Sequence, residues 1–82
     1  MTYLTALEIA SNHPNGDIKI MEGQDKETLK WAGFIFLMRN GEIHKLMISM
    51  EPSDIWAGFD TQEEATTKMQ ELIDFAINYV NP

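Results

Sequence analysis

The residue types that most often carry catalysis or bind metals are few in this chain. Its 82 residues include no Cys and only two histidines, His13 and His44. We expect His13 in a turn and His44 near the tip of a hairpin, and their spacing matches no metal-binding motif. None of the serines at positions 11, 49 and 53 lies in the Gly-x-Ser-x-Gly turn that exposes a nucleophile. The sequence therefore predicts no catalytic residue, no metal site and no cofactor.

Paired carboxylates are the remaining candidates for acid–base chemistry, which requires burial to raise the pKa of one of them. Glu63 and Glu64 are adjacent, but they follow Thr61 at the spacing of a helix capping box. Asp54 and Asp60 flank a stretch that mixes carboxylates with aromatic residues. They support one alternative hypothesis, a small enzyme with a carboxylate site near these two residues. That hypothesis requires one of the two acids to lie in a concave pocket.

The charge of the chain is acidic and unevenly distributed. The formal net charge is −7, and residues 46–82 hold seven acids against one base. Nucleic acids and anionic membranes both attract basic surfaces, so the sequence predicts neither direct nucleic-acid binding nor membrane binding. A basic protein would be attracted instead, which suggests a second alternative, an acidic nucleic-acid mimic or phage-type inhibitor of a DNA-handling protein. Its acidic surface would consist of Asp60, Glu63, Glu64, Glu71 and Asp74.

Targeting signals are not visible in the sequence. Residues 1–10 contain no Lys or Arg, and Glu8 interrupts their apolar part, unlike a secretory signal. The longest apolar run, Phe34–Met38, is far shorter than the ~20 residues that span a bilayer. We therefore expect one cytoplasmic domain over residues 1–82.

Local patterns predict an α+β fold, with a small antiparallel sheet and a long C-terminal helix packed on one of its faces. Residues 17–21 favour a first strand, and Asn40-Gly41 predicts a type I′ turn between strands at 31–39 and 42–50. Residues 1–11 fit a helix or a fourth strand, and their helix-forming residues favour the helix, which gives the order α-β-β-β-α. In the last helix the buried stripe is expected to comprise Ala65, Met69, Leu72, Ile73, Ala76 and Val80.

The predicted hairpin over residues 31–50 is apolar on both faces. With Asn40 and Gly41 as turn residues, Arg39 pairs with Glu42 and Ile35 with Leu46, and alternate side chains point to opposite faces. An antiparallel sheet with one solvated side would carry polar residues there. A register displaced by one residue would remove this argument. One face would hold Trp31, Ile35, Leu37, Leu46, Ile48 and Met50, and the second would hold Phe34, Phe36, Met38, Ile43 and Met47.

The second apolar face needs a cover, because one helix with one apolar stripe covers only one face. The N-terminal segment, a second copy of the chain, and a different protein or apolar ligand are three ways to cover it. The leading hypothesis is a small, acidic, non-enzymatic protein–protein interaction module that acts as a homodimer or an accessory subunit. Its partner-binding residues would be Phe34, Phe36, Met38, Ile43 and Met47.

Overall fold

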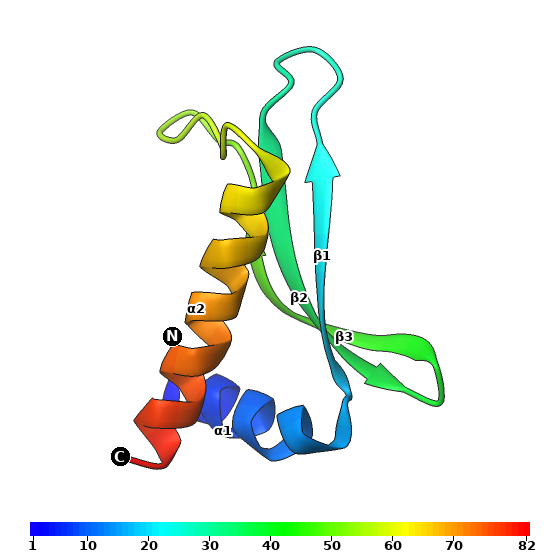
Figure 1. The fold of residues 1–82 in the computed structure, drawn as a ribbon, viewed down its shortest axis with the longest axis vertical. Coiled ribbons are helices and arrows are strands. Elements are labelled where there is room, and N and C mark those ends of the chain that lie inside the picture. Colours follow the sequence, from blue (N-terminus) through cyan, green and yellow to red (C-terminus); the bar gives the residue numbers. More distant parts are fainter.

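The chain has the predicted α+β architecture, in the order α-β-β-β-α (Figure 1). The computed structural model describes all 82 residues. The three strands form one antiparallel sheet in the order β1-β2-β3, so each strand pairs with its neighbour in the sequence. A short 3-10 turn follows the first helix. The elements are α1 (Tyr3–Asn12), β1 (Ile18–Gln24), β2 (Trp31–Arg39), β3 (Glu42–Met50) and α2 (Gln62–Val80).

Helix α2 begins at the predicted cap and presents the predicted apolar stripe. The Thr61 hydroxyl accepts a hydrogen bond from the Glu64 backbone N–H at 3.1 Å. The Glu64 carboxylate accepts from the backbone N–H of Asp60 at 3.2 Å, one residue before the position that a capping box predicts. Of the six predicted stripe residues, Leu72 and Val80 pack at the edge of the core, and the other four are buried: Ala65, Met69, Ile73 and Ala76.

Helix α1 lies against α2, on the same side of the sheet. Its N-cap is Thr2, whose hydroxyl accepts from the Thr5 backbone N–H at 3.2 Å. Ala6 and Ile9 are fully buried, and they share one core cluster with Ile35 of β2 and the apolar stripe of α2. The fourth-strand alternative for the N-terminal residues is therefore wrong. The N-terminal segment also does not cover the second face of the sheet, because both helices lie over the first.

The β2–β3 hairpin has the predicted turn. Asn40 and Gly41 have φ angles of 54° and 78°, as a type I′ turn requires. Next to the turn, Arg39 pairs with Glu42 and Met38 with Ile43. The register at the turn was thus predictable from two residues.

Farther from the turn the predicted register is wrong, because β3 contains two irregularities. Leu37 pairs with Lys45 where the sequence predicted His44, and Ile35 pairs with Ile48 where it predicted Leu46. Each irregularity inserts one extra residue into β3, so the pairing slips first by one residue and then by two. Two tertiary contacts accompany the slips. Lys45 forms an ion pair with Glu8 of α1 at 2.9 Å, and Met47 packs against the core.

The sheet packs tightly against α2 at Gly33, a buried glycine of β2. A Cβ atom at this position would lie 2.8 Å from Cγ of Met69. Met69 thus occupies the space that a side chain at residue 33 would need.

Neither α1 nor α2 combines the length and hydrophobicity that a membrane crossing requires.

Candidate functional site

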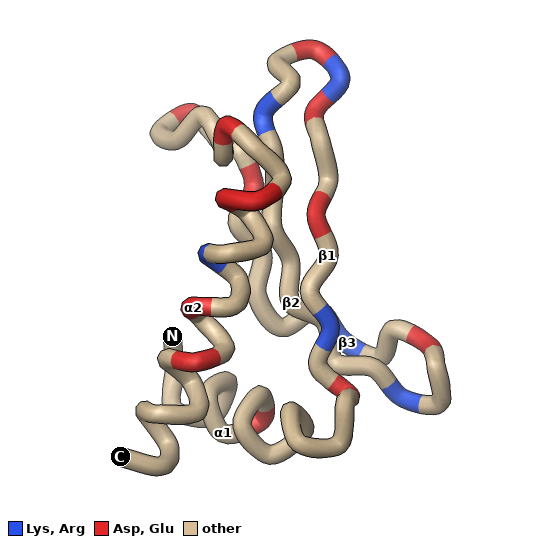
Figure 2. Tube along the Cα trace, in the orientation of Figure 1, with Lys and Arg blue, Asp and Glu red and all other residues tan.

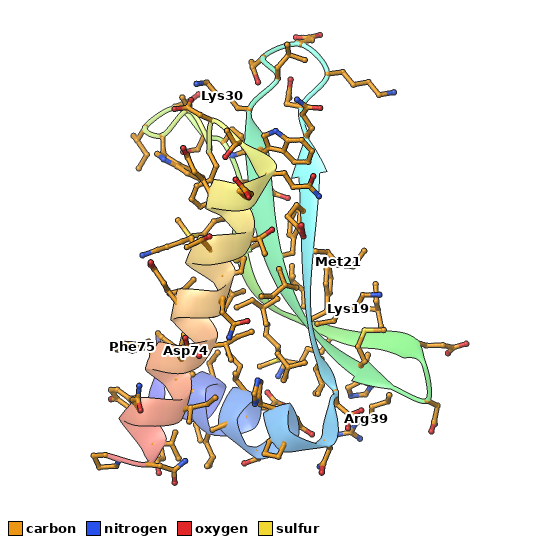
Figure 3. The ribbon with its side chains drawn as sticks, in the orientation of Figure 1. Lys19, Met21, Lys30, Arg39, Asp74 and Phe75 are labelled. Atoms are coloured by element: carbon orange, nitrogen blue, oxygen red, sulfur yellow. The ribbon has the colours of Figure 1, made fainter.

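The face of the sheet opposite the two helices, here called the open face, is covered by no other element. In β1 and β2, the pairs Lys19–Phe36 and Met21–Phe34 lie on this face, and the alternate residues point toward the helices. Figure 3 shows Lys19 and Met21 projecting from β1 away from α2. The side chains of the open face are Lys19, Met21, Ala32, Phe34, Phe36, Met38, Ile43, Leu46 and Ser49.

The open face is apolar and partly exposed to solvent. Met21, Leu46 and Ile43 are 37%, 48% and 55% exposed. The rings of Phe34 and Phe36 stack with their centroids 6.0 Å apart and are half-buried. An antiparallel sheet with one solvated face usually alternates apolar and polar side chains, so this exposed surface departs from the common pattern.

Four of the five residues predicted to bind a partner lie on the open face, and Met47 does not. The bulge at Met47 turns this side chain toward the helices, where it packs against the core. Leu46, which the sequence placed on the covered face, takes its position beside Phe36. The argument from the predicted pairing therefore fails for β3, but burial and strand pairing identify an apolar open face independently. The binding role of Phe34, Phe36, Met38 and Ile43 stays a prediction.

Two open-face residues of β1, Met21 and Lys19, were missed by the sequence analysis. The signal for them was present, because Ile18 and Ile20 share one face of a strand at residues 17–21, and alternation then puts Lys19 and Met21 on the other. Lys19 is exposed, forms no ion pair and is the only charged side chain among those of the open face.

One end of the open face contains a concave region, here called the sheet-end hollow. Gly23 and Ala32 pair there, and their lack of bulk leaves space beside the ring of Phe34. The volume of the hollow is about 320 Å3. Its walls come from the end of β1, the loop after it, and the residues after β3: Gly23, Gln24, Asp25, Lys30, Ala32, Phe34, Glu51 and Pro52.

The charge of the sheet-end hollow is negative. Asp25 accepts hydrogen bonds from the backbone N–H groups of Thr28 at 2.9 Å and Glu27 at 2.8 Å, which hold the pKa of its carboxyl below the ordinary aspartate value. Glu51 is exposed and forms no ion pair. Lys30 is the one cation of the lining, and it is engaged by Asp60 in an ion pair. The hollow therefore offers two carboxylate side chains beside an aromatic ring.

The predicted acidic surface lies at the start and along the exposed sides of α2 (Figure 2). Glu63, Glu64 and Glu71 line a shallow surface region together with Lys68, which lies 3.8 Å from the Glu71 carboxylate. Asp74 accepts from the side-chain amide of Gln70 at 3.2 Å, and Asp60 is held by Lys30. These five acids are exposed and lie on α2 or just before it. The mimic hypothesis stays a prediction.

The carboxylate-site hypothesis finds no pocket in the structure. Asp54 and Asp60 are both exposed, and neither lines any of the three surface hollows. No group of three or more His, Asp or Glu side chains is arranged to hold a metal ion. His44 is one of the two extra residues of β3 and is exposed. The condition that the hypothesis set, an acid in a concave pocket, is not met.

A second exposed apolar surface lies on the helices and was also missed. The Tyr3 ring of α1 lies 5.8 Å from the Tyr79 ring of α2, and Phe75 lies 5.7 Å from Tyr79. Phe75 and Tyr79 are four residues apart and therefore adjacent on the helix surface, outside the buried stripe. Leu4 of α1 is also exposed. No family model, curated protein or solved structure matches the chain.

Proposed function

We propose that this chain is a small protein–protein interaction module that docks its partner on the open face. The observation that carries this proposal is the uncovered apolar surface formed by Met21, Phe34, Phe36 and Leu46. Contiguous apolar surface on a folded chain is characteristic of interaction sites. Covering each 100 Å2 of such surface contributes about 2.5 kcal/mol, which is a considerable fraction of the ~5–15 kcal/mol that stabilises a whole domain.

The open face suits docking better than the helix patch does. On the strands, its side chains include one charged group, Lys19, and one hydroxyl, that of Ser49. Further charged groups lie only at the sheet-end hollow, so little polar surface must be desolvated when a partner binds the rest of this face. In the helix patch, Tyr3 and Tyr79 each carry a hydroxyl that a partner would have to hydrogen-bond. The sheet also presents its apolar side chains from paired strands, which limits the conformational entropy lost on docking.

The acids of α2 do not oppose docking on the open face. They lie on the helix side of the sheet, so a partner on the open face stays away from most of the negative charge. The proposal therefore requires an apolar partner surface and does not require a basic one.

Site-specific photo-crosslinking in the cells that produce the protein tests this proposal. A photoreactive residue replaces Leu46 on the open face, and the matched control replaces Leu4 on α1, which is also an exposed leucine. We expect discrete protein adducts from position 46 and none of comparable yield from position 4. Equal yields, or adducts from position 4 alone, would contradict docking on the open face.

A further inference from the structure

The open face differs in bulk between its two ends. Phe36 and Leu46 are paired at one end, next to Lys19, and the other end has Gly23 beside Ala32 over the sheet-end hollow. A middle row separates the ends and consists of Met21, Phe34 and Ser49. Lys19 and Gly23 are four residues apart on β1, or about 13 Å at the rise of a strand.

This difference in bulk makes the open face complementary to itself under one two-fold axis. A two-fold interface uses the same patch on both copies, so each residue must fit its symmetry mate. Such an axis can lie between two facing sheets and run across the strands at the middle row. Rotation about it places each end of one open face over the opposite end of the other copy's open face. Phe36 then lies over Ala32, and Lys19 lies over Gly23, so bulky residues meet small ones. An axis along the strands would instead place Phe36 on Phe36 and leave the hollow without an occupant.

Charge favours the same arrangement. The ammonium of Lys19 would meet the hollow that contains the carboxylates of Asp25 and Glu51, while Lys30 stays with Asp60. The methylene stem of Lys19 can lie along the ring of Phe34, as lysine stems commonly do on apolar surface. Symmetry makes this contact twice in each dimer. The acidic α2 helices end up on the two outer sides, which keeps the negative surfaces apart.

We infer that the occupant of the open face is a second copy of this chain, with its strands antiparallel and each Lys19 in the other copy's sheet-end hollow. This inference rests on the proposed function and names its partner. Association through the β3 edge is less favourable, because the two bulges of β3 interrupt the outer ladder of that edge.

The dimensions of the open face set the expected strength of association. Three strands about 4.8 Å apart and up to nine residues long give a projected area of roughly 400 Å2 per copy. About 800 Å2 in total lies below the ~1,200 Å2 at which stable specific interfaces begin, in the range of weak and transient ones. The dimer should therefore be reversible, with a monomer–dimer equilibrium that depends on protein concentration.

Sedimentation velocity over a wide range of protein concentration tests the inference with charge-reversed variants. We expect Lys19→Glu and Glu51→Lys each to raise the dimer dissociation constant at least about tenfold, since each places like charges together. The double variant should associate more tightly than either single variant. Lys68→Glu on α2 changes the net charge as Lys19→Glu does and should leave the dissociation constant within about threefold. All altered residues except the half-buried Lys68 are exposed, and circular dichroism with thermal unfolding checks that each variant folds.

The possible results separate the inference from the proposed function. A wild-type chain that stays monomeric at every concentration overturns the dimer, and so do adducts from position 46 that contain only other proteins. The latter result leaves the open face as the docking surface. A dimer that Lys19→Glu weakens no more than Lys68→Glu overturns the antiparallel arrangement. A dimer that only Tyr79→Lys dissociates assigns self-association to the helix patch and overturns the open-face dimer, and crosslinking from position 46 then decides the docking proposal separately.

Discussion

Alanine replacements of two strand glycines test whether one face of the sheet is packed and the other open. Gly33 points toward the helices, and Gly23 points to the open face one position along the ladder. A Cβ atom at Gly33 would lie 2.8 Å from Cγ and 3.0 Å from Cε of Met69. At Gly23 the nearest atom, Cε2 of Phe34, would be 3.6 Å away, which is ordinary van der Waals contact.

The structure gives the two substitutions opposite signs. Neither glycine has a positive φ, so alanine causes no backbone strain at either position. Overpacking a well-filled core costs ~1–3 kcal/mol, and Gly33→Ala should destabilise the fold by that amount. Gly23→Ala should stabilise it by ~0.4–1 kcal/mol, because alanine lowers the conformational entropy of the unfolded chain. For a domain of this size each 1 kcal/mol corresponds to ~4–8 °C in Tm.

Urea unfolding followed by far-UV circular dichroism measures both effects. The protein is kept at one low concentration, so that association does not contribute to the unfolding free energy. Gly23→Ala serves as the matched control for Gly33→Ala, since both introduce one methyl group into neighbouring strands. Equal losses at the two positions, or a larger loss at Gly23, would show that the open face is packed and would refute the reasoning.

Two local contacts give further predictions. Thr61→Ala removes the hydroxyl that caps α2 and should lower the free energy of unfolding by ~1 kcal/mol, as measured by urea unfolding; no change would mean that the cap is not formed in solution. The lowered pKa of Asp25 means that its contribution to stability is present above the ordinary aspartate pKa and is lost as the pH falls through the lower folded-state pKa. An NMR titration of the Asp25 carboxyl should therefore give a pKa below that of unfolded aspartate, and urea unfolding at stepped pH should show the difference between wild type and Asp25→Asn shrinking across that window.

The parts of the fold that depend on local chemistry were predictable from the sequence. The cap at Thr61 and the turn at Asn40-Gly41 each depend on a few adjacent residues, whose conformational preferences decide the structure. The apolar stripe of α2 depends on helical spacing alone. The same spacing placed Phe75 and Tyr79 outside the stripe, and only the packing of α1 brought Tyr3 beside them.

The two bulges were not predictable, because distant contacts accompany them and no local pattern marks them. A regular ladder would keep Lys45 on the open face and away from Glu8, whereas the observed ladder lets the two form an ion pair. The sheet-end hollow was also not predictable from any local pattern. Asp25 and Glu51 lie 26 residues apart in the sequence, and they line one hollow only because β1 and β3 both end beside β2.

Placing both helices on one face leaves this chain with a single covered layer and a small core. Ten of its 82 residues are buried, and chains of this length gain little from their own interior. Sheets are usually stabilised by burying an apolar face against another layer. Facing two open sheets would add an inner core between them and give a four-layer assembly, helices outside and sheets inside. The half-buried state of Phe34 and Phe36 fits such a reversible assembly, since each ring keeps a partner in the monomer and gains a second in the dimer.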